Sequence, residues 1–140
     1  NSRLDSIQAA ILSVKLKYLE SFIEERRQVA NFYDEALSGI DELILPKRDM
    51  NSTHVYNQYT VQLKSGDVEK LRSSLKELGI PTMKYYPEPL YNQKAYKQNI
   101  TLEHTEKLCN TVFSLPIGTD MNEEQLNYIT QNLIEIIKQK

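Results

Sequence analysis

The sequence predicts an α+β domain in which a long N-terminal helix and a small, mainly antiparallel sheet are covered by further helices. Three observations predict this class. Apolar residues recur at helical spacing through residues 3–37, short segments with strand patterns follow, and two amphipathic stretches end the chain. The order helix, strand, strand, helix, strand, helix, helix is typical of this layout, which proteins of many functions share.

The N-terminal helix is the longest predicted element. Charged residues such as Glu20 and Arg27 lie between its apolar positions, and no proline interrupts residues 3–37. Gly39 is expected to end the helix in the left-handed C′ conformation. A helix of about 35 residues is about 50 Å long at 1.5 Å per residue. Because a small domain cannot cover that length, we expect either that one end docks on something outside this sequence or that the helix kinks.

Strand patterns occur in residues 42–45, 54–63 and 80–86. The first stops at Pro46, and the third has Pro81 near its start, where a missing N–H is tolerated. Through residues 54–63 the side chains alternate as they do in a strand. We therefore expect Val55 and every second residue after it to share one face, with Tyr56 on the other.

Three shorter helices are predicted from their caps. Asp67 is a candidate N-cap for residues 68–78, and Gly79 closes that helix. The other two helices cover residues 102–112 and 123–138. Asn122 is the expected N-cap of the last one, with Gln125 at the capping-box position. Residues 113–116 form a short extended link between these two helices.

Composition excludes several classes of function. The chain has 140 residues, about one domain, and its 17 basic and 19 acidic side chains give a net charge of −2. This balance indicates neither nucleic acid nor an anionic membrane as a partner. The single cysteine, Cys109, cannot form an internal disulfide, and no apolar run reaches the ~20 residues of a membrane span. We expect a cytoplasmic protein, and a fragment, because residue 1 is Asn and a helical pattern is already present at Leu4.

Searches for common catalytic and metal motifs find nothing. The four glycines form no phosphate-binding loop. His54 and His104 have no carboxylate or cysteine at metal-ligand spacing, so we interpret both as surface residues. Cys109 lies on the inner face of a predicted helix with no basic group placed to lower its pKa, which favours a buried thiol over a nucleophile.

Two segments are unusual. Asn1 and Arg3 lie at the start of a helix, where free N–H groups and a planar cation favour an anion. The alternative is an N-cap with a solvated arginine. Residues 85–96 hold four tyrosines with Pro87 and Pro89, and such a stiff segment can present rings and hydroxyls to a sugar. The alternative there is a tyrosine-rich loop that packs over the sheet.

Both segments belong to an ordered set of motifs that resembles the DegT/DnrJ/StrS family of sugar aminotransferases. Residues 1–10, NSRLDSIQAA, look like the family's N-x-R-(L/M)-D-x-x-Q-A-A signature. Residues 54–59, HVYNQY, are similar to its H-x-Y-x-x-Y strand. Residues 79–96 resemble its G-I-x-T…Y-P-x-P-L-H-x-Q-x-x-Y segment. Glu106 and the Ser-Leu-Pro of residues 114–116 match its C-terminal pattern.

The resemblance implies the small C-terminal domain, residues 1–140, of a fold type I aminotransferase that transfers an amino group from glutamate to a nucleotide-linked keto sugar. Its own N-terminal large domain would carry the Schiff-base lysine and most of the pocket for pyridoxal 5′-phosphate, so this fragment would be inactive alone. Such enzymes are homodimers. Asn1 would reach the cofactor phosphate of the partner subunit, with Arg3 nearby, and Lys84 and Lys94 would be surface residues.

The resemblance also implies that the loop from Tyr86 to Tyr96 lines the sugar-nucleotide pocket, with Tyr86, Tyr91, Gln93 and Tyr96 as substrate-binding residues. Tyr91 stands where the family often has His, and it cannot become cationic near neutral pH. Two alternatives remain open: a cofactor-dependent sugar dehydratase on the same scaffold, and a non-enzymatic regulatory or interaction domain.

Overall fold

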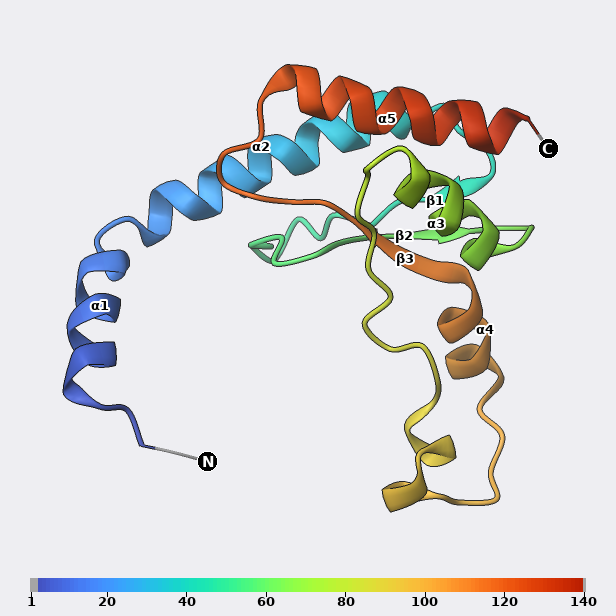
Figure 1. The fold of residues 1–140 in the computed structure, drawn as a ribbon, viewed down its shortest axis with the longest axis horizontal. Coiled ribbons are helices and arrows are strands. Elements are labelled where there is room, and N and C mark those ends of the chain that lie inside the picture. The colour runs from blue at the N-terminus through green and yellow to red at the C-terminus, as the bar shows by residue number, and fades with distance from the viewer. Residues whose placement is uncertain (1–2, 140) are drawn as a thin grey trace.

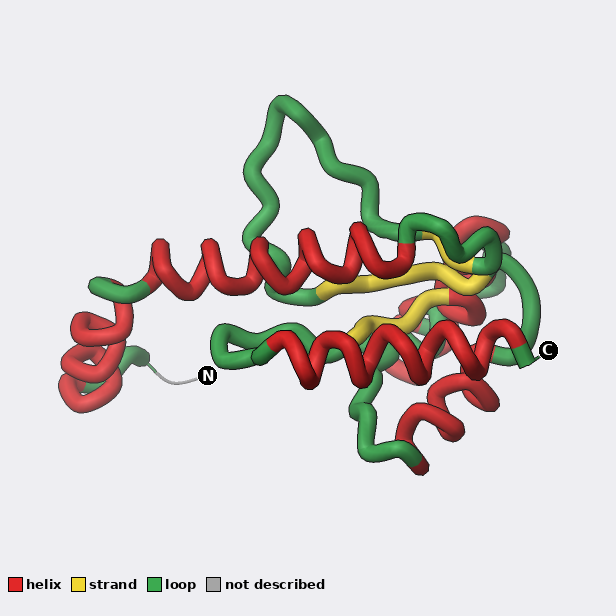
Figure 2. Tube along the Cα trace, turned by 90° about the horizontal axis from the view of Figure 1, so that it is seen from above, coloured by secondary structure: helices red, strands yellow, loops and turns green. Residues whose placement is uncertain are grey.

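The structure, a computed structural model, describes residues 3–139 as five α-helices, two short 3-10 helices and three strands. Their order is α1 (Ser6–Leu16), α2 (Leu19–Leu37), β1 (Leu43–Ile44), β2 (Tyr59–Leu63), α3 (Val68–Glu77), η1 (Leu90–Asn92), η2 (Lys94–Tyr96), α4 (Glu103–Thr111), β3 (Val112–Leu115) and α5 (Glu123–Lys138). The predicted α+β class is confirmed. Helices α2 and α5 lie side by side over one face of the sheet (Figures 1 and 2).

The N-terminal helical region is two helices, not one. The first ends at a turn in which the amide of Tyr18 donates to the carbonyl of Lys15 at 3.0 Å, and α2 begins at Leu19. The direction of the chain changes sharply there (Figure 1). This is the kink that the length of the region led us to expect as one of two outcomes.

The sheet is antiparallel throughout, in the order β1-β2-β3. Tyr59 pairs with Leu115 and Leu43 with Leu63, so β2 lies in the centre. Residues 113–116, which we interpreted as a link, therefore contribute an edge strand. Beyond that strand, Met83 forms a single bridge with Ser114 through two hydrogen bonds of 3.1 and 2.8 Å.

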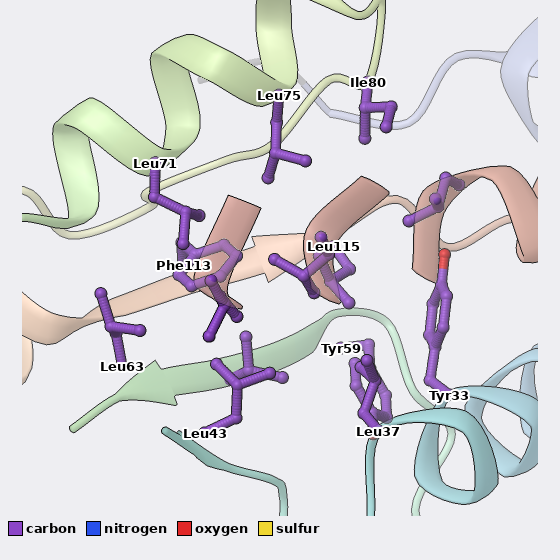
Figure 3. Packing of buried hydrophobic residues seen from close by; sticks show 14 of the residues in the cluster. Tyr33, Leu37, Leu43, Tyr59, Leu63, Leu71, Leu75, Ile80, Phe113 and Leu115 are labelled. Carbon is purple, nitrogen blue, oxygen red and sulfur yellow. The ribbon is translucent and has the colours of Figure 1, made fainter. Parts of the chain in front are cut away.

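The hydrophobic core lies between the sheet and the helices above it. Every second residue of β2 faces this core, and each is at most 2 % exposed. Tyr33 from α2 and Leu75 from α3 reach the same layer (Figure 3). Tyr33 is fully buried, and its hydroxyl donates to the carbonyl oxygen of Pro116 at 2.7 Å. The core thus joins α2 to the loop that follows β3.

Two predicted strands are shorter in the structure, for different reasons. Residues 54–58 lie outside β2, because Tyr56 takes a left-handed conformation (φ 46°) that breaks the alternation and buries its ring. The expectation that Tyr56 faces away from the core was wrong. Residues 80–86 form only the bridge at Met83, because Pro81 lacks an amide hydrogen and the chain turns away after that one contact.

The predicted caps of the later helices are confirmed. Asp67 and Asn122 both cap their helices with side-chain oxygens, and Asn122 with Gln125 forms a complete capping box. Gly79 has φ 73° after α3. Gly39 does not have a positive φ, so our expectation of a left-handed end there was wrong: the chain leaves α2 through Ser38 in ordinary helical geometry. Cys109 is buried, as expected.

Candidate functional site

Helix α1, helix α4 with residues 84–102, and the uncovered face of the sheet all lie on the side of the sheet opposite α2 and α5. Figure 1 shows α1 extending to this side at one end, and α4 with residues 84–102 extending to it at the other. The uncovered face of the sheet lies between them. Polar residues of β2 point to this face, because the alternate residues point into the core. Helix α1, which follows the first unusual segment, and the loop that holds the second thus lie around one side of the domain.

Tyr91, in η1, connects the beginning of the segment 91–106 to its end at the first turn of α4. Its side chain is buried, and its hydroxyl donates to Oε1 of Glu106 at 2.7 Å and accepts from the amide of Leu102 at 3.3 Å. The carbonyl of Tyr91 accepts from the amide of Gln98 at 3.1 Å. Burial, and then the hydrogen bond to Glu106, raise the pKa of Tyr91. A substrate acceptor could take the hydrogen of this hydroxyl only by displacing Glu106.

The other residues expected to bind substrate are accessible. Tyr86 is 77 % exposed, Tyr96 is also exposed and lies in η2, and Gln93 is exposed between the two 3-10 helices. The loop therefore presents three of its four predicted residues to solvent, while Tyr91 holds the loop from within. Lys94 is exposed, as expected.

Lys84 is not the free surface residue that we expected. Its side chain is only 9 % exposed, and Nζ lies 3.0 Å from Oε1 of Glu69 in α3. Glu69 also pairs with Arg72 at 2.8 Å, and Arg72 donates to the side chain and carbonyl of Thr82. This network fixes the start of the loop to α3, a long-range contact that no local sequence pattern indicates.

The segment before α1 carries the cofactor residues that the resemblance implies. Arg3 is exposed and makes no hydrogen bond or ion pair with the other described residues. Asp5 caps the helix by accepting from the amide of Gln8 at 2.8 Å. Asn1 lies outside the described residues.

Helix α1 buries none of its own side chains. Ile7 is 75 % exposed and Leu16 68 %, although both are large and apolar. A shallow apolar groove runs from Leu4 along this helix to Leu19 and Phe22 at the start of α2. Exposed apolar surface of this kind marks a contact with another protein surface.

Three adjoining cavities are lined by residues of the sheet and of the loops next to it. One of about 690 Å³ lies where residues 79–81 and 116–122 meet the start of α5. A second, of about 280 Å³, shares Pro81, Pro116 and Ile117 with it. A third, of about 450 Å³, shares Asn57 and Gln58 with the second. No sequence pattern described above pointed to Asn57 and Gln58 as binding residues. Their position within the H-x-Y-x-x-Y motif was the signal available.

The metal and membrane interpretations can be compared with the structure over residues 3–139. Within that range no group of His, Cys, Asp and Glu side chains could hold a metal ion. Both His54 and His104 are exposed, as expected of surface residues. No helix in the same range is both long and apolar enough to span a bilayer.

Comparison with known proteins agrees with the motifs. The family model described as the DegT/DnrJ/EryC1/StrS aminotransferase family matches residues 1–134. A pleiotropic regulatory protein of Geobacillus stearothermophilus is 39 % identical over 99 % of this chain and 38 % of its own length. A UDP-N-acetyl-3-dehydro-α-D-glucosamine 3-aminotransferase of Acidithiobacillus ferrooxidans is 38 % identical over 90 % of this chain and 34 % of its own.

A solved structure shows the same fold with a cofactor. It is that of NtdA from Bacillus subtilis with the bound cofactor PMP. It has 26 % identity and a TM-score of 0.86, and the match covers 99 % of this chain and 33 % of that one. The chain thus spans about a third of the length of the relatives that it matches.

Proposed function

The chain belongs to the DegT/DnrJ/EryC1/StrS aminotransferase family, and from this premise we propose that it is the small C-terminal domain of a pyridoxal-phosphate-dependent nucleotide-sugar aminotransferase. The complete cytoplasmic protein would transfer an amino group from glutamate to the keto group of a nucleotide-linked sugar. The observation that carries this proposal is the family match across residues 1–134. Residues 1–140 would complete the site and be inactive alone.

The exposed apolar face of α1 supports a larger protein around this domain. Side chains such as Ile7 and Leu16 add little hydrophobic stabilisation to this domain, because they remain largely exposed to water. Removing them from water would stabilise a contact with the large domain or with the second subunit of a homodimer. The relatives are about three times as long as this chain, which leaves room for that large domain.

The described residues fit the phosphate end of pyridoxal phosphate. Arg3 offers an exposed guanidinium without a partner among them, and a guanidinium binds phosphate oxygens in a bidentate manner. Arg3, together with Asn1 of the same segment, would hold the phosphate of the cofactor in the partner subunit. When bound, the cofactor supplies the electron sink of the reaction. The lysine that forms the Schiff base with the cofactor would lie in the large domain. Lys84, at the start of the loop, is paired with Glu69.

On the substrate side, the loop of residues 86–96 would bind the nucleotide sugar through Tyr86, Gln93 and Tyr96. All three are exposed, and the loop that holds them extends to the side of the sheet where α1 also lies (Figure 1). Tyr91 would contribute in a different way, because its buried hydroxyl holds the loop in shape through Glu106 and Leu102. The tyrosine rings give apolar faces with polar tips, which suit a sugar or a base.

The test of the function uses the complete protein with pyridoxal phosphate, glutamate, and UDP- or dTDP-linked 3-keto and 4-keto sugars. The expected products are an amino sugar and one equivalent of 2-oxoglutarate, followed by mass spectrometry. Loss of a sugar hydroxyl without formation of 2-oxoglutarate would favour the dehydratase. A complete protein that binds pyridoxal phosphate and leaves every one of these sugars unchanged would refute both reactions.

A regulatory role is the second candidate, because the relative from Geobacillus stearothermophilus is named a pleiotropic regulatory protein. The two roles differ in whether the cofactor is bound. A complete protein with no visible absorbance from pyridoxal phosphate, even after incubation with an excess of it, would favour the regulatory role over the enzyme.

The proposed phosphate contacts have their own test. We expect Asn1→Ala and Arg3→Ala in the complete protein each to weaken the binding of pyridoxal phosphate about 5–30-fold, which corresponds to about 1–2 kcal/mol, the scale of one hydrogen bond. Lys17→Ala, at an exposed position beyond the other end of α1, is the matched control and should leave the affinity unchanged. Equal affinity in all four proteins would refute the assignment.

A further inference from the structure

The segment before β2 is held in an unusual conformation by contacts from a distant helix. Tyr56 has φ 46°, a region that bulky side chains avoid, so the surrounding structure must hold it there. Arg26 of α2 donates to the carbonyl of Val55 at 3.1 Å, and Arg27 donates to the carbonyl of His54 at 3.1 Å. The amide of Tyr56 donates to Nδ1 of His54 at 2.8 Å.

The ring of Tyr56 is fixed as well. It is buried against His54 at 4.4 Å and Tyr59 at 6.2 Å between ring centroids, and the guanidinium of Arg48 lies 5.6 Å from its centroid. Backbone strain that is held from several directions is found mostly at functional sites. The two residues that directly follow the strained turn at Tyr56 are Asn57 and Gln58.

Asn57 and Gln58 carry two neighbouring carboxamides that are free to bind a ligand. Asn57 is exposed and Gln58 half-buried, and neither side chain has a hydrogen bond to another described residue. Both line the cavity of about 280 Å³ and the adjoining one of about 450 Å³. Each carboxamide can donate two hydrogen bonds and accept two. The other side chains of this polar face are engaged: the hydroxyls of Thr60 and Ser114 lie 2.7 Å apart.

The chemistry of the smaller cavity selects a neutral, hydroxyl-rich group. Besides the two amides it is lined by Thr82, Met83 and Tyr85, and none of the described residues that line it is a lysine or arginine. A diphosphate would find no cation there. Its volume of about 280 Å³ is just below the usual range for ligand pockets, which suits one ring and not a whole nucleotide sugar.

We propose that Asn57 and Gln58, presented by the strained turn at Tyr56, form a subsite that binds the hydroxyl groups of the substrate's sugar ring. This inference rests on the proposed function and adds to it a pair of residues outside the loop of residues 86–96. The sugar ring lies between the carboxamides and the side chains of Met83 and Tyr85, which supply its apolar contact. The nucleotide is bound elsewhere.

The experiment separates binding of the sugar from binding of the nucleotide. In the complete protein, the dissociation constants of a UDP- or dTDP-linked hexose and of UDP or dTDP alone are measured by isothermal titration calorimetry. Asn57→Ala and Gln58→Ala are compared with Asn51→Ala, an exposed asparagine that lines none of these cavities.

We expect Asn57→Ala and Gln58→Ala to weaken the binding of the nucleotide sugar about 3–12-fold each, and that of the nucleoside diphosphate less than about 2-fold, on the scale of single hydrogen bonds. Asn51→Ala changes neither. Equal losses for sugar-linked and free nucleotide, or no loss at all, overturn the subsite. A protein that makes an amino sugar while its Asn57 and Gln58 variants bind normally refutes the subsite alone, whereas one that binds no nucleotide sugar refutes the proposed function with it.

Discussion

Tyr33→Phe removes a single oxygen from the centre of the domain. The ring of Tyr33 is fully buried and stays in place in the variant, so no cavity is created around it. What is lost is the hydrogen bond of 2.7 Å from the hydroxyl to the carbonyl of Pro116, at the start of the loop that lines two of the cavities.

The expected cost follows from the surroundings of that bond. A typical buried hydrogen bond contributes about 0.5–1.5 kcal/mol net, and an acceptor left unpaired costs about 1–3 kcal/mol. Pro116 is only partly buried, so water can reach its carbonyl and the lower part of the range applies. We expect the free energy of unfolding to fall by about 1–2 kcal/mol. With a typical urea m-value of about 2 kcal/mol per M, the midpoint falls by about 0.5–1 M.

The assay is urea unfolding followed by far-ultraviolet circular dichroism. Tyr128→Phe is the matched control, because its hydroxyl also donates to a backbone carbonyl, that of Leu78 at 3.0 Å, but at an exposed position. We expect a change within about 0.5 kcal/mol for this control. If both variants lose the same stability, or Tyr33→Phe loses none, then burial does not decide the value of these bonds and the reasoning fails.

Three further predictions concern the backbone at a glycine, the dependence of stability on pH, and the loop held by Tyr91. Gly79→Ala should lower the free energy of unfolding by about 1 kcal/mol, because alanine is strained at φ 73° even though its Cβ would contact no other atom. Gly39→Ala is the control: its Cβ also meets open space but φ is not positive, so urea unfolding should show no loss or a small gain, and equal effects of the two variants would contradict the reasoning. Burial raises the pKa of Tyr33 above its usual 10.0, so the unfolded chain loses this proton first, and the urea midpoint should fall as pH rises above about 10; a flat profile from about pH 8 to 11 would refute it. Tyr91→Phe should speed proteolytic cleavage within residues 91–106 and raise KM more than it lowers kcat in the complete enzyme, while Tyr96→Phe, at an exposed position, should leave the cleavage rate unchanged.

The elements that were predicted with correct ends are those whose signals are local. Helix α5 covers Glu123–Lys138 as expected, because Asn122 and Gln125 satisfy its first amides and its apolar residues recur every three to four positions. Asp67 and Gly79 likewise mark the ends of α3. These signals act within a few residues of one another, so they can be recognised in a sequence without knowledge of the fold.

The candidate site was predicted unevenly for the same reason. The segments around Arg3 and residues 85–96 were found from their composition and from the family motifs, and the roles proposed for them remain predictions. Asn57 and Gln58 were missed because their importance depends on Tyr56, whose conformation is held by Arg26 and Arg27 some 30 residues earlier. No alternation pattern can indicate a contact of that kind.

The fold class, the caps of the later helices and the family motifs could thus be recovered from the sequence, since each depends on residues close together in the chain. The break between α1 and α2 was one of two outcomes that the length of the region allowed. The pairing of Lys84 with Glu69, the turn at Tyr56 and the hydrogen bond between Tyr91 and Glu106 are different in kind. Each joins groups from segments that are separate in the sequence, and their free energy arises only when folding brings the partners within hydrogen-bond distance.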